Sequence, residues 1–142
     1  MFEKILLPTD GSEFSELEVE RAIKALADDG EIIILSVAHQ LKATTPFQSK
    51  KDIESMNKKF LKEAERNVDH MAKKFKQHVK VKKMVIPGLP SETIIRVAEE
   101  EDVDLIIIAA SGKSGLHRFF IGSVAEKVLK TTEIDSLLIH NK

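Results

Sequence analysis

The chain has 142 residues and no cysteine, which suits one domain over residues 1–142 that needs no disulfide or metal for stability. Hydrophobic residues make up 42% of the sequence, which excludes a disordered chain, and no apolar run approaches the ~20 residues of a membrane span. The formal net charge of −1 gives the chain as a whole no electrostatic case for binding nucleic acid. The N-terminus has no signal-peptide pattern, so we expect a cytoplasmic protein.

The predicted strands and helices alternate along the chain. A first strand at Phe2–Pro8 precedes a helix that begins at residue 12 or 15, runs to residue 28 and is stopped by Gly30. Ser91 is expected to cap a short helix. The remaining strands are expected at residues 31–38, 78–86, 104–110 and 134–140, with the longest helix at 50–77 and a last helix ending near 130.

Two of these strands, at residues 31–38 and 104–110, carry continuous apolar runs, IIIL and LIIIAA. Continuous apolar strands are typical of parallel sheets that helices cover on both faces. The alternation therefore predicts a single doubly wound α/β domain with a mostly parallel sheet. Ligands of such sheets bind beyond the carboxyl ends of the strands, which directs attention to the loops Thr9–Ser12, Ala38–Thr45 and Ala109–Ser123.

Charge is unevenly distributed. Residues 50–83 hold 12 Lys or Arg against 5 Asp or Glu, a local excess of +7. Two interpretations stay open, namely the solvated outer face of an amphipathic helix and a binding surface for an acidic partner.

The loop before the last helix is punctuated by glycine. Gly112 and Gly122 bracket nine residues, and Ser123 follows directly. Glycines let a backbone approach a ligand closely, and amides at a helix N-terminus attract anionic oxygens. The alternative is a tight strand-to-helix connection in which Gly122 permits close helix packing.

Three segments follow one another in a specific order and spacing, namely ILLPTDGSEFSELEVERAI, LSVAH and IIIAASGKSGLHRFFIGSVAEKVLKTTEIDSLLIH. Through these segments nearly the whole chain resembles the universal stress protein family. The resemblance implies a five-stranded parallel sheet in a Rossmann-like fold, and a homodimer joined through the C-terminal strand.

The ATP-binding branch of this family carries the motif G-x2-G-x9-G-[S/T]. Here Gly112, Gly122 and Ser123 match the motif, whereas Ala109 replaces its first glycine. The resemblance implies ATP, with Mg²⁺ or Mn²⁺ bound through the phosphates, and a set of nucleotide-binding positions. These are Pro8, Thr9, Asp10, Val37, Ile108, Ala109, Gly112, Gly122, Ser123 and Val124.

Some of these positions have a simpler explanation. Asp10 would face the ribose or merely form an Asx-type turn or helix cap, and Ile108 would line the ligand or belong to the core. Val37 would contribute its backbone to adenine recognition, so its side chain carries little information. Val124 would offer its N–H to a phosphate beside Ser123.

A catalytic constellation is absent from the sequence. There is no P-loop, no GxSxG and no HExxH motif, so we expect at most slow ATP hydrolysis. The favoured function is a nucleotide-binding regulatory switch of the stress response with an unknown protein partner. The alternatives are a dimeric stress-response module that does not bind ATP and an enzyme acting on an adenylated substrate.

Overall fold

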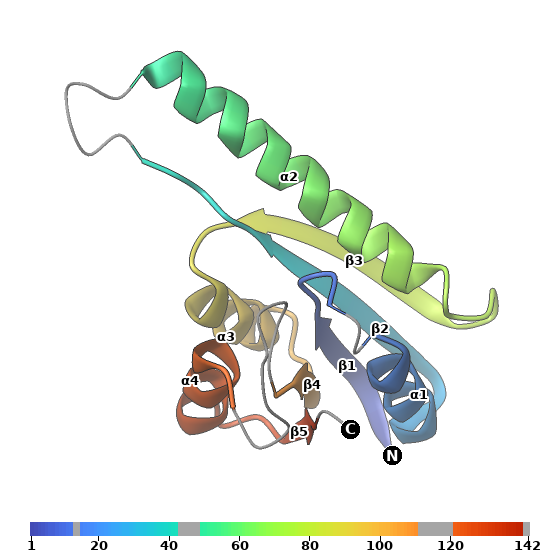
Figure 1. Ribbon diagram of the computed structural model, residues 1–142. Coiled ribbons are helices and arrows are strands. Elements are labelled where there is room, and N and C mark those ends of the chain that lie inside the picture. Colours follow the sequence, from blue (N-terminus) through green and yellow to red (C-terminus); the bar gives the residue numbers. More distant parts are fainter. Residues whose placement is uncertain (13–14, 43–48, 111–120, 141–142) are drawn as a thin grey trace.

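The computed structural model describes residues 1–12, 15–42, 49–110 and 121–140 (Figure 1). Strands and helices alternate as predicted, and all five strands run parallel in one sheet of order β3-β2-β1-β4-β5. The elements are β1 (Phe2–Pro8), α1 (Ser15–Ala25), β2 (Leu26–Ala38), α2 (Lys50–Ala72), β3 (Lys80–Pro87), α3 (Pro90–Glu100), β4 (Leu105–Ala109), α4 (Ser123–Thr131) and β5 (Ser136–Ile139). The predicted α/β class is confirmed, and the sheet is all-parallel.

The direction of winding reverses at β1. The chain adds β2 and then β3 on one side of β1 and returns to the other side for β4 and β5. One hydrophobic core lies between the sheet and the helices α1 and α2, and the other lies between the sheet and α3 and α4. The point where the winding reverses is therefore the gap between β1 and β4, where the carboxyl ends of both strands meet.

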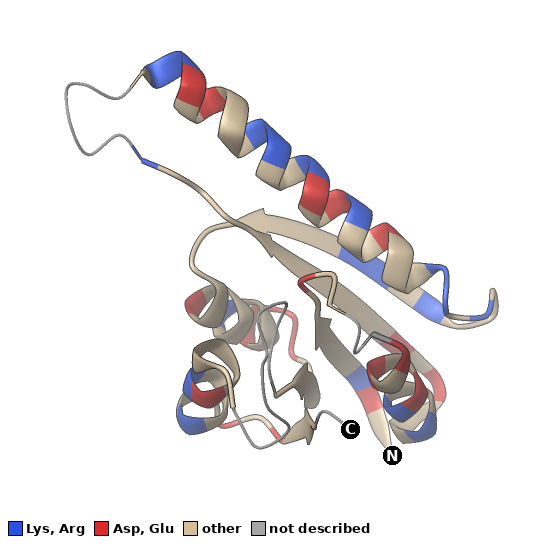
Figure 2. Cartoon of the chain, viewed as in Figure 1, with Lys and Arg blue, Asp and Glu red and all other residues tan. Residues whose placement is uncertain are grey.

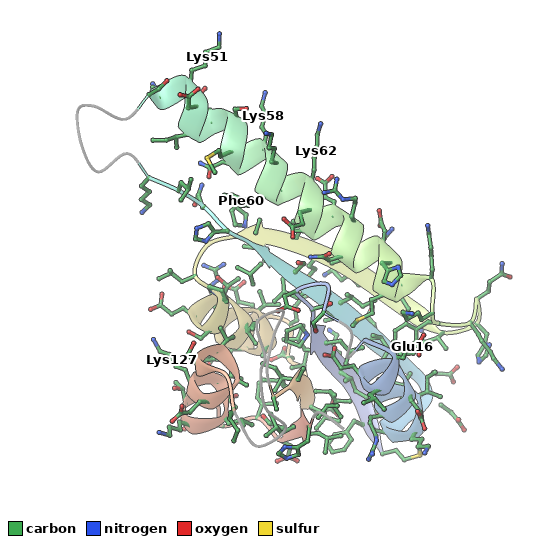
Figure 3. The ribbon with its side chains drawn as sticks, in the orientation of Figure 1. Glu16, Lys51, Lys58, Phe60, Lys62 and Lys127 are labelled. Atoms are coloured by element: carbon green, nitrogen blue, oxygen red, sulfur yellow. The ribbon has the colours of Figure 1, made fainter. Side chains whose placement is uncertain are left out.

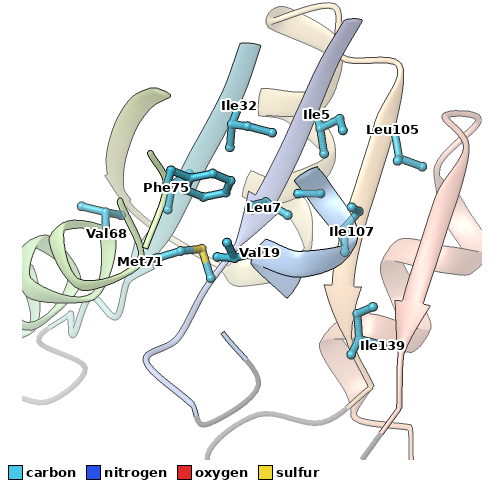
Figure 4. Packing of buried hydrophobic residues seen from close by; sticks show 12 residues of the cluster. Ile5, Leu7, Val19, Ile32, Val68, Met71, Phe75, Leu105, Ile107 and Ile139 are labelled. Atoms are coloured by element: carbon cyan, nitrogen blue, oxygen red, sulfur yellow. The ribbon is translucent and has the colours of Figure 1, made fainter. Parts of the chain in front are cut away.

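Alternation of side chains along the strands supplies both cores. Ile5 and Leu7 of β1 and Ile107 of β4 face α1 and α2, where Met71 packs among them (Figure 4). Leu6 of β1 belongs to the core under α3 and α4. All of these side chains are fully buried.

The predicted end of the first helix is wrong. The helix α1 ends at Ala25, and Gly30 lies inside β2 instead of stopping a helix. Between Phe2 and Lys4 of β1 the pairing register jumps from Leu26 to Glu31 of β2, so the extra residues form a bulge. Asp29, whose φ of 62° is left-handed, lies in this bulge. The turn-forming residues that were expected to end the helix therefore form the bulge instead.

Two further helix boundaries differ from expectation. The helix α3 begins after Leu89 with Pro90 in its first turn, so Ser91 lies within the helix and does not cap it. The helix α2 ends at Ala72 and not at residue 77, because the chain turns there and buries Phe75 in the core.

The lysines of α2 lie on its outer face. Lys51, Lys58 and Lys62 are exposed and point away from the sheet, whereas Phe60 faces β2 (Figure 3). Its ring meets the His39 ring edge-on, with centroids 5.0 Å apart. Acidic residues are interspersed along the same helix (Figure 2). The outer face is thus solvated, and an acidic partner for it stays a prediction.

Candidate functional site

The carboxyl ends of three neighbouring strands meet at the point where the winding reverses. Pro8 of β1 pairs with Leu35 of β2, and Leu6 pairs with Ile106 of β4. The Thr9 amide continues the ladder by donating to the Leu35 carbonyl at 2.8 Å. The residues that follow these pairs therefore lie along one edge of the sheet (Figure 1).

The segment after β1 is a tight turn. The amide of Gly11 donates to Thr9 Oγ1 at 3.2 Å, and the amide of Ser12 donates to Asp10 Oδ1 at 3.0 Å. The Asx-type turn expected as one interpretation of Asp10 is confirmed. Asp10 is exposed, so it remains accessible to solvent at the edge of the sheet.

Gly11 connects this turn to α2. Its φ of 81° is in the left-handed region, and a Cβ placed on it would lie 2.4 Å from Asn67 Oδ1. The sequence patterns did not single out Asn67. The feature that could have identified it is a polar residue on the inward-facing side of α2, one position before buried Val68. The turn therefore lies against α2 and is held by its own hydrogen bonds.

Val37 directs its backbone toward the same edge. The Leu35 carbonyl points toward β1, and N–H and C=O groups two residues apart on a strand point to the same side. Those of Val37 therefore point to the side where β1 has already ended. The Ala38 carbonyl points the other way, since it accepts from the Gly88 amide beside β3.

Ala109 ends β4 in ordinary extended backbone. It pairs with Ile139 of β5, and the described non-glycine residues with left-handed backbone are Asp29 and Asp102. Glycine is therefore not required at position 109 by its φ. Ile108 is buried in the core under α3 and α4, and its role in lining a ligand stays a prediction.

The helix α4 begins beside the end of β4. The Gly122 amide donates to the Ala110 carbonyl at 2.5 Å, and the Gly122 carbonyl accepts from the Glu126 amide at 3.0 Å. Ser123 and Val124 are the first two helical residues, so their amides have no partner within the helix. Such amides, together with the helix dipole, favour an anion. Gly112 lies outside the described residues.

Glu18 on α1 is a second residue that the sequence did not reveal as special. Its side chain is 2% exposed, and Oε2 has no hydrogen-bond partner among the described residues. Burial, and after it the charge of Asp10, raise the pKa of the Glu18 carboxyl well above its usual value. Its apolar neighbours on α1 gave no signal that a glutamate would face inward.

The parallel sheet, whose winding reverses between β1 and β4, places the chain among the Rossmann-like α/β folds. Folds of this class generally bind ligands at the carboxyl ends of their strands, where the winding reverses. The family model described as "Universal stress protein family" matches residues 1–140. The chain therefore belongs to the universal stress protein family. In the part of the chain that the structure describes, no helix is long and apolar enough to span a bilayer.

Similar proteins agree with this assignment. Universal stress protein MJ0577 of Methanocaldococcus jannaschii is 32% identical to the chain, over 100% of the chain and 97% of its own length. A solved structure of MJ0577 superimposes with a TM-score of 0.84 at 31% identity, over 100% of this chain and 98% of that one.

Two more distant structures hold nucleotides. One is a universal stress protein in complex with cAMP, with a TM-score of 0.62 at 21% identity, over 99% of both chains. The other is a family protein from Arabidopsis thaliana with AMP bound, with a TM-score of 0.66 at 17% identity, over 96% of this chain and 90% of that one. At these identities the likeness shows the shared fold.

Proposed function

We propose that this universal stress protein binds ATP at the carboxyl edge of its sheet and acts as a nucleotide-dependent regulatory switch. The observation that carries the proposal is the start of α4, whose first amides lie beside the end of β4. The turn Thr9–Ser12 lies at the same edge, since β1 is the neighbour of β4 in the sheet.

Each part of the nucleotide has a matching protein group. The amides of Ser123 and Val124 suit phosphate oxygens, because they are donors at the positive end of a helix dipole. The backbone of Val37 suits the donor and acceptor edge of adenine. The carboxylate of Asp10 suits ribose hydroxyls. The cAMP and AMP complexes of distant relatives support an adenine nucleotide as the ligand class.

A divalent cation would be held mainly through the phosphates. The described residues offer no group of three acidic or histidine side chains placed to ligate a metal. Mg²⁺ commonly keeps waters and bridges phosphate oxygens with few protein ligands, so this arrangement suits Mg²⁺ or Mn²⁺. The ion would neutralise phosphate charge next to the turn.

Any bound nucleotide is first released by denaturation and identified, and the protein is refolded. The direct test is then a calorimetric titration of the refolded protein with ATP and Mg²⁺. We expect saturable binding below 1 mM ATP, that is, a binding free energy stronger than about −4 kcal/mol. The absence of binding at millimolar ATP would refute the proposal.

Gly122→Val locates the site. Its φ of −63° and ψ of 155° are accessible to valine, so the fold is expected to survive. The added side chain would stand where phosphate approaches the helix, and loss of a charge-assisted hydrogen bond of about 1.5–3 kcal/mol weakens ATP binding by about 10- to 150-fold. Unchanged ATP affinity at an unchanged melting temperature would show that the phosphates do not bind at the start of α4.

Ala109→Gly tests the departure from the family motif. Because Ala109 has ordinary strand backbone, glycine relieves no strain there. We expect ATP affinity to change by less than about threefold and stability to fall by about 0.5–1 kcal/mol. A tenfold gain in affinity, measured by the same titration, would show that the methyl group obstructs the ligand.

The alternative is a dimeric binding module that does not hold ATP, which the replaced glycine at Ala109 favours. A dimer through β5 has support from the two edges of the sheet. Lys80, Lys82 and Lys83 lie on the edge strand β3 and discourage pairing, whereas Ser136–Ile139 of β5 carries no charge. The ATP titration separates the two functions, since the alternative predicts a dimer by light scattering and no binding of ATP.

A further inference from the structure

Glu18 is an anomaly in the inner face of α1. Its neighbours on that face, Val19 and Ala22, belong to the core with Leu7 and Ile107, and Glu18 is as buried as they are. A buried charge without a partner costs several kcal/mol, so a buried glutamate either finds a partner or keeps its proton.

The surroundings of Glu18 favour the proton. The strands packed against α1 present apolar side chains on this face, among them Ile5, Leu7 and Ile107. Lys74, in the segment after α2, pairs with exposed Glu16 of α1. Exposed Glu20 pairs with Lys24. Among the described residues, the carboxylate of Asp10 is the charge that acts on Glu18.

The position of Asp10 links this buried acid to the candidate site. Asp10 holds the turn Thr9–Ser12 through its bond to the Ser12 amide, and Gly11 lies close to Asn67. The helix α1 begins at Ser15, three residues after this turn, so the packing of α1 in the core fixes the chain that leaves the turn. As a neutral acid, Glu18 adds no charge to this region, and its O–H is an additional donor. When it is ionised, it adds a second negative charge that interacts with that of Asp10.

We propose that Glu18 is a proton-dependent latch, which as a neutral carboxylic acid keeps the inner face of α1 packed in the core and which loosens α1, and with it the turn Thr9–Ser12 just before it, when the proton is lost. The chain would then sense pH at the edge of the sheet where the nucleotide is proposed to bind. The latch itself does not require nucleotide. Only its effect on affinity rests on the proposed function.

The stability of the apo protein tests the latch. The folded protein holds the Glu18 proton more tightly than the unfolded chain does, so stability is greatest below the ordinary glutamate pKa and falls as pH rises to the raised value. The unfolding equilibrium constant should grow by up to about tenfold per pH unit in this window. Urea titrations between pH 4 and 8 measure it.

Two variants make the test specific. Glu18→Gln should lack this component of the pH dependence, whereas the matched control Glu20→Gln, exposed on the same helix, should keep it. Asp10→Asn removes the like charge and should move the window to lower pH. Equal pH profiles for wild type and Glu18→Gln would overturn the latch.

A direct titration covers the case in which Glu18→Gln does not fold. The ¹³C shift of the Glu18 carboxyl in the wild-type protein should titrate well above the other glutamates, and titration at or below pH 4.5 would overturn the latch. In the nucleotide arm, ATP affinity should fall through the same window in wild type relative to Glu18→Gln. If neither protein binds ATP, the proposed function fails while the apo measurements still decide the latch.

Discussion

Leu7→Ala is expected to lower the free energy of unfolding by about 3–5 kcal/mol, since a leucine deleted from a packed core loses its transfer energy and leaves a cavity. Leu7 is fully buried in the core under α1 and α2, on the central strand β1. A domain of this size has about 5–15 kcal/mol of stability, so the variant loses a large part of it.

The matched control is Ile23→Ala on α1. Ile23 is 47% exposed, so truncation there should cost less than about 1 kcal/mol. Urea titrations of the two variants measure both values. Similar losses for Leu7→Ala and Ile23→Ala would contradict the assignment of the core, and with it the placement of the turn Thr9–Ser12, which begins two residues after Leu7.

Gly11→Ala is expected to destabilise the fold and to weaken ATP binding. A left-handed backbone costs about 1–2 kcal/mol for a residue with a Cβ, and the new methyl group would also meet the side chain of Asn67. The total loss of stability should therefore be about 2–3 kcal/mol, with overpacking supplying the remainder. The distorted turn would carry Thr9 and Asp10 away from the nucleotide.

A double-mutant cycle with Asn67→Ala separates the two causes. In the Asn67→Ala background, Gly11→Ala should retain the cost of the backbone, about 1–2 kcal/mol, and lose the cost of the clash. Ser12→Ala is the control, since it changes a side chain in the same turn without placing a Cβ on left-handed backbone. If Gly11→Ala costs the same in both backgrounds, α2 does not brace the turn through Asn67.

The order of elements, the parallel sheet and the two layers of helices could be predicted from the sequence. An apolar run such as that within residues 104–110 has apolar side chains on both faces of the strand, so the strand must be covered by helices on both sides. The helix boundaries could not be predicted as well. Asp28-Asp29-Gly30 has the chemistry of a turn, and a bulge inside β2 satisfies it as well as a helix end does.

For the candidate site, sequence reasoning placed the segments but not their supports. Thr9, Val37, Ala109 and the Gly122 end of α4 converge because parallel strands end on one edge. Asn67 approaches the turn from α2, and Glu18 is buried on α1. Which side chain a helix buries depends on tertiary packing that a single sequence does not reveal.

The measurement that tests the central claim most directly is a ¹⁵N NMR titration of the wild-type protein with ATP and Mg²⁺. We expect the largest amide shifts at Thr9, Gly11, Val37, Ser123 and Val124, which together trace the edge of the sheet between β2 and β4. No shifts at millimolar ATP, or shifts that concentrate on the lysine face of α2, would contradict a nucleotide site at that edge.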